Sequence, residues 1–229
     1  MAPIFGYGSL ILPTSLVSRF ENVDPTLEKI YSGEIDETVR DDALSKWEER
    51  RDRITYVPAK LWGFRRYYTL ESDRGGMMLE TIRTDDPDDW INGVLISGLS
   101  EDEERQIAES ESVYEYLTVE EPRLEFYVDP AEIDGADPAD FSAVRIFASD
   151  KSPEAMRADA PRNRVYHSRI RTGIMMIGEM YGADVAKAFY DDFRETTYET
   201  AYDADDPTAF NTVAENDRLS EDSEWQPNA

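Results

Sequence analysis

Short apolar runs, separated by turns rich in glycine, proline or acidic residues, dominate the first two thirds of the chain. Their content of β-branched and aromatic side chains predicts β-strands. The second strand is expected to end at Pro58. Residues 60–70 are rich in aromatic side chains, and the interruption at Gly63 is a common mark of a bulge or bend. The predicted strands cover residues 3–10, 53–57, 77–81, 91–99, 114–119, 124–128 and 143–148.

Apolar residues with helical spacing mark the last third of the chain. Ile174 and Ile177 repeat at an interval of three, and Gly182 is suited to the position just after a helix. Earlier in the chain, Ser100 and Glu103 form a capping box, which predicts that a helix begins at the next residue. The predicted helices cover residues 13–20, 101–112, 165–181 and 183–202.

The order of these elements, strands first and helices last, predicts the fold class. A single α+β domain over residues 1–202 fits this order better than alternating βαβ units. Residues 32–53 are highly charged, with sparse apolar positions from residue 34 onward, and are interpreted as a surface helix or an insertion. Residues 203–229 hold eight acidic residues and one arginine, so this tail is expected to be partly disordered.

Composition excludes several classes of site. The chain has no cysteine, which rules out a disulfide framework, a thiol nucleophile and thiolate metal ligands. The single histidine, His167, rules out a multi-histidine metal site within one chain. No apolar run approaches the roughly 20 residues of a membrane span, and the first residues lack the features of a secretory signal. We therefore expect a soluble, cytoplasmic protein without membrane contact.

The net charge of −26 allows two interpretations. One is a functional acidic surface that mimics nucleic acid or binds basic partners. The other is adaptation to molar salt, where the Debye length falls to about 3 Å and repulsion between like charges is screened. The acidic residues are spread along the whole chain, whereas an interaction patch would concentrate them, so adaptation to salt is favoured. No basic face for direct nucleic-acid binding is found.

The first candidate for chemistry is the turn after the first strand, Tyr7-Gly8-Ser9-Leu10. Glycine permits positive φ and close backbone approach, so successive N–H groups in such a turn can converge on an anion or oxyanion. An ordinary tight turn is the simpler interpretation of these four residues alone. No Lys-Ser/Thr follows, which excludes a phosphate loop, and Ser9 as a nucleophile would need His167 as its base.

The second candidate is Glu111, at the end of the helix predicted for residues 101–112. Glu111 follows Ile107 by four residues, so it shares a helix face with an inward apolar side chain. A carboxylate held against the core can act as a general base. In so acidic a chain, an exposed surface position without a catalytic role is the simpler interpretation of any single glutamate. Glu109 is the alternative candidate for the base.

Taken together, five segments of the chain resemble the γ-glutamylcyclotransferase-like family. A later tyrosine, Tyr166, followed by an apolar helix is similar to the family's C-terminal pattern. The resemblance spans residues 4 to about 182. Its segments are Phe-Gly-Tyr-Gly-Ser-Leu (5–10), Pro-Ala-Lys-Leu-Trp-Gly-Phe-Arg-Arg-Tyr (58–67), Asn-Gly-Val-Leu (92–95), Ile-Ala-Glu-Ser-Glu (107–111) and the helix after Tyr166.

The resemblance implies a mixed, barrel-like β-sheet with helices packed around it, and an intramolecular aminolysis. In that reaction the α-amino nitrogen of a γ-glutamyl compound attacks its own γ-carbonyl and releases 5-oxoproline with an amine or amino acid. Carried over by position, Glu111 is the general base. The loop whose backbone holds the γ-glutamyl group corresponds to Tyr7, Gly8, Ser9 and Leu10, and Tyr166 lines the pocket. No metal, cofactor or nucleic acid is implied; the expected partner is a small-molecule substrate.

This chain also departs from the family pattern. Ala108 stands where the family often has aspartate, and the spacing from Glu111 to the next tyrosines is unusual. Related amidotransfer, or removal of a γ-glutamyl group from a larger molecule, therefore stays open. An alternative from a different functional class is a non-catalytic member of the same fold that binds a small molecule or a protein. The leaving group and the oligomeric state are not predicted.

Overall fold

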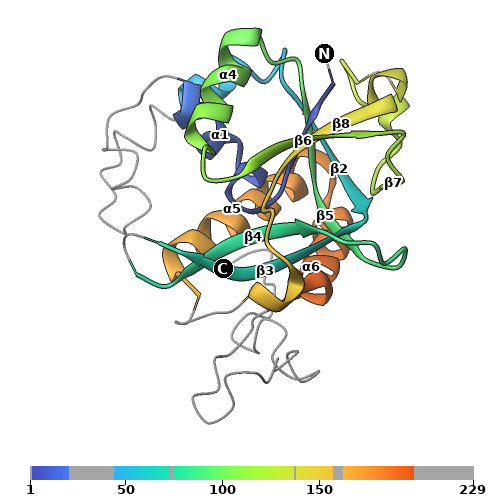
Figure 1. The fold of residues 1–229 in the computed structure, drawn as a ribbon. Helices are drawn as coiled ribbons and strands as arrows, with labels where there is room; N and C mark the ends of the chain where they lie inside the picture. The colour runs from blue at the N-terminus through green and yellow to red at the C-terminus, as the bar shows by residue number, and fades with distance from the viewer. Residues whose placement is uncertain (1, 21–43, 73–74, 137, 157–161, 199–229) are drawn as a thin grey trace.

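Nine strands in two sheets, with helices packed on them, make up the described part of the chain (Figure 1). The computed structural model describes residues 2–20, 44–72, 75–136, 138–156 and 162–198. The predicted α+β class with a mixed sheet is confirmed, because helices and both parallel and antiparallel strand pairs are present. Closure of the sheets into a barrel stays a prediction. The tail 203–229, and residues 32–43 of the charged segment, lie outside the described residues.

The larger sheet places the first strand of the chain near its centre. Strand β1 pairs in parallel with β8 and antiparallel with β5, and all three of its residues are buried. The turn that follows β1 therefore emerges from the middle of the sheet. The strand order is β6-β8-β1-β5-β2-β7, with β1 at Ile4–Gly6, β2 at Thr55–Trp62, β5 at Trp90–Ser97, β6 at Glu115–Glu120, β7 at Leu124–Phe126 and β8 at Ala143–Ala148.

The smaller sheet has the order β4-β3-β9, with β3 at Phe64–Glu71, β4 at Met77–Arg83 and β9 at Thr197–Tyr198. Gly63, with φ +86°, lies between β2 and β3 and turns the chain from one sheet into the other. The predicted bend at Gly63 is thus confirmed. Beyond the end of β8, Ser149 N donates to Thr81 O of β4 at 2.7 Å, which ties the larger sheet's chain to the smaller sheet.

Strand β2 does not end at Pro58 as the sequence predicts; it continues to Trp62. The carbonyl of Pro58 accepts a hydrogen bond from Tyr127 N, so its backbone polar groups face β7 and not β5. The paired residues of β2 and β7 begin only at Ala59. Proline therefore lacks its N–H at the end of the β2–β7 pairing, where no bond is lost within that pairing. The pairing of β2 with β5 continues undisturbed through Pro58.

Three of the four predicted helices begin and end close to where the sequence predicts. The capping box of Ser100 and Glu103 is present, and Asn163 caps the helix that carries Tyr166 by accepting from Tyr166 N. Gly182, with φ +101°, ends that helix. The helices are α1 at Pro13–Phe20, α4 at Glu101–Ser110, α5 at Arg164–Tyr181 and α6 at Ala183–Thr196, with 3₁₀ turns η1 at Gly8–Ile11, η2 at Pro130–Glu132, η3 at Pro138–Ser142 and η4 at Pro153–Ala155.

Helix α6 ends at Thr196, earlier than the predicted residue 202, because the next residues pair with β3 as β9. The fully buried guanidinium of Arg66 fixes this end. It donates to the hydroxyls of Thr196 and Thr197 at 3.0 and 2.9 Å and to Phe193 O at 3.3 Å, and it also bonds both oxygens of Asn92. Burial lowers the pKa of Arg66 to about 10, which leaves it charged near neutral pH.

We expect Arg66→Met to destabilise the protein by about 3 kcal/mol or more, because it leaves several buried oxygens without a donor. The matched control is Arg51→Met. Arg51 pairs with Glu48 at the surface, and both side chains are more than half exposed. Its loss should change stability by about 1 kcal/mol or less. Denaturant unfolding of both variants measures the difference; equal effects would contradict a central role for Arg66.

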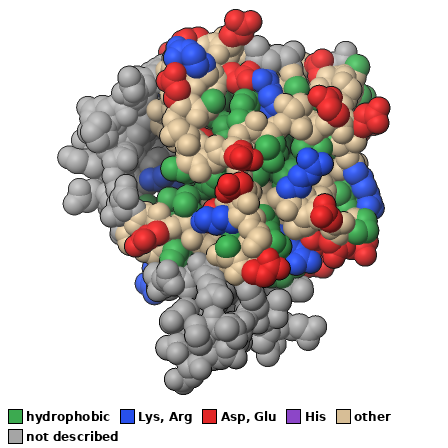
Figure 2. All heavy atoms as spheres, viewed as in Figure 1, with side chains coloured by type: hydrophobic (Ala, Val, Ile, Leu, Met, Phe, Trp, Pro, Cys, Tyr) green, Lys and Arg blue, Asp and Glu red, His purple; other side chains and the backbone are tan. Residues whose placement is uncertain are grey.

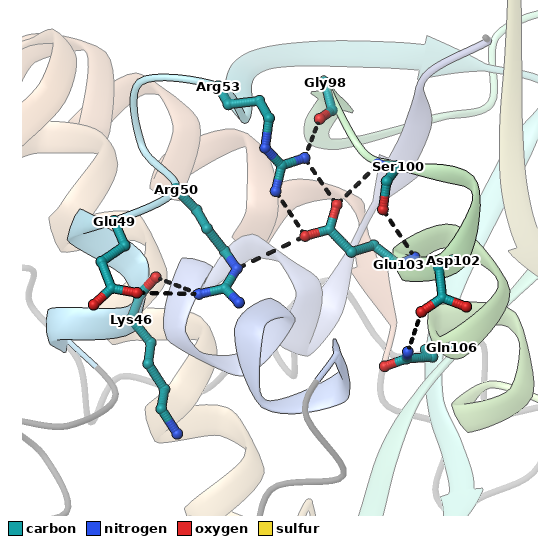
Figure 3. Close-up of polar contacts among 9 residues, drawn as sticks. All are labelled: Lys46, Glu49, Arg50, Arg53, Gly98, Ser100, Asp102, Glu103 and Gln106. Carbon is teal, nitrogen blue, oxygen red and sulfur yellow. Dashed lines mark hydrogen bonds and ion pairs between the residues drawn. The ribbon is translucent and has the colours of Figure 1, made fainter.

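The described end of the charged segment is folded against α4. Residues 44–48 are helical, and Trp47 is buried, with its ring edge-on to Tyr56 at 5.4 Å. Figure 3 shows the attachment: Arg53 bonds both carboxylate oxygens of Glu103 at 2.7 and 2.8 Å, and Arg50 approaches the same carboxylate. Glu103 also caps α4, so this cluster fixes the helix start and the charged segment together.

The visible face of the molecule carries acidic side chains interspersed with lysine and arginine (Figure 2). This distribution matches the even spread of charge along the sequence. Among the described residues, no helix is long and apolar enough to cross a membrane.

Candidate active site

Four segments of the chain meet beside the end of β1. They are the turn after β1, the last turn of α1, the turn after α4, and the first turn of α5 (Figure 1). The residues that connect them are Gly8, Arg19, Glu111 and Tyr166. The structure thus brings together all three parts of the site that the sequence predicts: the glycine turn, the candidate base and the later tyrosine.

The glycine turn has the backbone conformation that its sequence predicts. Gly8 has φ +65°, a region that side-chain-bearing residues rarely adopt, and it opens η1. Leu10 lies in the hydrophobic core, while Tyr7 and Ser9 are also buried. Gly173 of α5 lies against the backbone of Ile11, where a Cβ would come within 2.8 Å of the carbonyl carbon. This close contact fixes α5 against the turn.

Tyr166 lies directly over Gly8. A Cβ on residue 8 would overlap with the Tyr166 hydroxyl, so glycine is required here by space as well as by conformation. Burial and the nearby Glu111 charge raise the pKa of Tyr166 to about 12, while hydrogen bonding from the backbone of Ser9 and Leu79 acts in the opposite direction. The Tyr166 hydroxyl therefore lies against the backbone of the turn.

Glu111 is held by Arg19. Oε1 of Glu111 accepts from Nε and Nη2 of Arg19 at 2.9 and 2.5 Å, so both bonds end on the same carboxylate oxygen. Glu111 is the C-cap residue of α4, and the two side chains are 15% and 17% exposed. The carboxylate is therefore fixed at a largely enclosed position, with Oε2 outside the ion pair.

Two further tyrosines enclose the same region. Tyr114, in the turn that follows Glu111, donates from its hydroxyl to Leu79 O at 3.0 Å. Burial raises the pKa of Tyr114, and the neighbouring Tyr7, Tyr166 and Glu111 raise it further. The pKa of Tyr7 is raised for the same reasons. All three phenols are therefore neutral hydrogen-bond donors near neutral pH.

Two alternatives raised by the sequence find no support in the geometry. Glu109 points to solvent and pairs with Arg105 across one helical turn, with 65% of its side chain exposed. Ser9 Oγ accepts from Arg19 at 3.2 Å, whereas the ring of His167 bonds Tyr68. A serine nucleophile activated by His167 is not assembled.

His167 is instead a buried structural residue. Its Nδ1 shares a hydrogen bond of 2.7 Å with Tyr68 Oη, and its Nε2 has no partner among the described residues. Burial, with smaller contributions from Arg162 and Arg171, lowers the pKa of His167 to about 4.

The lowered pKa of His167 predicts an acid-sensitive part of the stability. Below its ordinary value of 6.5 the unfolded chain binds a proton that the folded chain does not, so stability falls as the pH drops toward 4. The loss amounts to about 3 kcal/mol across this window. We expect His167→Gln to reduce the difference in unfolding free energy between pH 7 and pH 4.5. Identical pH dependence in the two proteins would contradict this assignment.

Sequence reasoning missed Arg19 and the direct involvement of Tyr114. No motif surrounds Arg19, and its partner Glu111 lies 92 positions away. One indication of its role was present in the sequence: Arg19 is a single cation in the last turn of the helix that begins just after the glycine turn. Among the described residues, no group of three histidine, cysteine or acidic side chains could hold a metal ion.

Comparison of the chain with family models, with curated proteins and with solved structures finds no match in any of the three. The assignment of function therefore depends on the site itself.

Proposed function

We propose that this chain is a γ-glutamylcyclotransferase-like enzyme, which converts a γ-glutamyl compound into 5-oxoproline and a free amine or amino acid. The observation that carries the proposal is the meeting of Glu111, the Gly8–Ser9 turn and Tyr166. These are three parts that the family resemblance required from separate regions of the sequence. We propose the family's barrel-like fold as well, supported by the bond from Ser149 N to Thr81 O between the two sheets.

The reaction needs a base, and Glu111 supplies it. The substrate's α-amine is an ammonium in water and must lose a proton before it can attack. The proposed acceptor is Oε2 of Glu111, which lies outside the ion pair with Arg19. The neutral nitrogen then forms a bond to the γ-carbon of the same molecule, and this intramolecular geometry supplies much of the rate.

The developing oxyanion needs donors, and the glycine turn with the tyrosines can supply them. Backbone N–H groups aimed at the reacting oxygen stabilise a tetrahedral intermediate without reorganisation. Gly8, with its positive φ, permits such an orientation in this turn. The phenols of Tyr7 and Tyr166 stay protonated because burial raises the pKa of each.

In the last steps of the proposed reaction, two protons are transferred to the leaving nitrogen. When the intermediate collapses, the bond from the γ-carbon to the leaving nitrogen breaks, and protonated Glu111 returns its proton to that nitrogen. The ring nitrogen gives up a second proton, which completes the leaving ammonium at neutral pH. The products are the lactam and one amine, and Glu111 is again ionised. The step consumes no water.

The test is direct incubation with γ-glutamyl amino acids and γ-glutamyl amines in molar KCl, with 5-oxoproline as the readout. We expect turnover of at least one of these substrates and none of their N-acetylated forms, which lack a free α-amine. Saturable binding without any turnover would favour the non-catalytic alternative. Neither binding nor turnover would remove the proposed function.

A further inference from the structure

Arg19 connects three parts of the candidate site through its guanidinium. Nε and Nη2 bond Glu111 Oε1, and Nη2 also donates to Ser9 Oγ at 3.2 Å. Nη1 donates to Ser15 O at 2.8 Å and to Ser15 Oγ at 3.1 Å. The base, the glycine turn and helix α1 are therefore fixed relative to one another by one side chain.

This ion pair differs from an ordinary pair on a helix surface. Helix α4 carries such a pair, Arg105 with Glu109, in which both side chains are more than half exposed and one helical turn apart. Arg19 and Glu111 instead join two helices, and both are more than four-fifths enclosed. An enclosed, multiply bonded pair fixes the geometry of its carboxylate much better than an exposed pair does.

We propose that Arg19 is a positioning residue: it holds Glu111 by Oε1 against the Gly8–Ser9 turn, so that Oε2 is the oxygen that accepts the substrate's proton. This proposal rests on the proposed function. The bonding pattern supports it, because both guanidinium bonds end on Oε1 and none on Oε2.

The charge of Arg19 adds a second contribution. A guanidinium stays protonated at any working pH, so it cannot take the substrate's proton itself. A cation beside the substrate's ammonium also disfavours that ammonium and favours the neutral amine that attacks. Arg19 thus keeps its carboxylate in place and helps to release the proton that this carboxylate receives.

The experiment is a double-mutant cycle on the full chain, with Arg19→Met, Glu111→Gln and the double variant assayed for 5-oxoproline release. We expect Arg19→Met to lower kcat by about 100-fold, the scale for a misplaced catalytic group, with KM within about threefold of wild type. In the Glu111→Gln background, Arg19→Met should have little further effect, because the group it positions is already gone.

Two variants complete the set. Arg105→Met removes the exposed pair with Glu109 on helix α4 and should leave kcat unchanged. Arg19→Lys keeps the charge but lacks the planar fork, so it should recover only part of the lost kcat. Melting curves accompany every variant, and Arg19→Lys serves for the cycle if Arg19→Met does not fold.

The outcomes separate the positioning role from the reaction itself. An active wild type with an equally active Arg19→Met overturns the positioning role alone. Equal effects of Arg19→Met in the wild-type and Glu111→Gln backgrounds also overturn it, because a residue that acts through Glu111 cannot act without it. A wild type that releases no 5-oxoproline overturns the proposed function, and the positioning role with it.

Discussion

Replacing Glu111 by glutamine is expected to lower turnover by roughly two to four orders of magnitude, the usual scale for a positioned acid–base group. Glutamine keeps the shape of the side chain, and its carbonyl oxygen can still accept from Arg19, whose two bonds both end on Oε1 of Glu111. It cannot accept the ammonium proton. The expected loss is therefore in kcat, with small changes in substrate binding. Steady-state 5-oxoproline release, measured beside melting curves, tests this.

The matched control is Glu109→Gln, two positions earlier on the same helix. Glu109 is exposed and pairs only with Arg105 among the described residues, so its replacement should leave activity and stability nearly unchanged. A folded but inactive Glu109→Gln together with an active Glu111→Gln would assign the base to residue 109. Full activity in both variants would contradict the cyclotransferase mechanism.

Replacing Gly8 by alanine is expected to reduce kcat by about 100-fold or more, because it displaces Tyr166 and the turn that is proposed to hold the substrate. Two effects act together at this position. The positive φ strains any residue with a Cβ, and the new Cβ would overlap with the Tyr166 hydroxyl. Kinetic assays with circular dichroism of the folded variant measure the effect.

Gly75→Ala separates these two effects. Gly75 also has a positive φ, +83°, but a Cβ there would meet no atom within 4 Å. Its replacement should lower stability by about 1 kcal/mol and leave kcat unchanged. Similar kinetics for Gly8→Ala and Gly75→Ala would show that Tyr166 and the glycine turn are not part of the reaction site.

Most of the fold could be predicted from local patterns in the sequence. The capping box at Ser100, the stop at Gly182 and the bend at Gly63 each depend on a few adjacent residues, and each is confirmed. Pro58 misled the prediction because the effect of a missing N–H depends on which neighbouring strand it faces. That neighbour, β7, is decided by tertiary pairing.

The end of α6 shows the same limit. Helical spacing predicts a continuation to residue 202, but the hydroxyls of Thr196 and Thr197 bond the buried Arg66, 130 and 131 positions away in sequence. A contact at such a distance leaves no local pattern. Tertiary bonding to Arg66 therefore overrides helix propensity at this end.

The candidate site was predicted in part for the same reason. The glycine turn is a local signal, and Glu111 follows from helix spacing together with the family resemblance. Arg19 could not be predicted, because its importance comes from a bond to a residue on another helix. The direction of the Glu109 side chain, which points to solvent and so argues against Glu109 as the base, could be learned only from the structure.

The most direct test of the central claim uses a γ-glutamyl substrate labelled with ¹⁵N at its α-amine, incubated with the wild-type chain in ¹⁸O-labelled water. Intramolecular aminolysis predicts 5-oxoproline that retains ¹⁵N and contains no ¹⁸O, released in equal amount with the amine. Glutamate that carries ¹⁸O would show hydrolysis by water instead. That product, or unchanged substrate, would contradict the account.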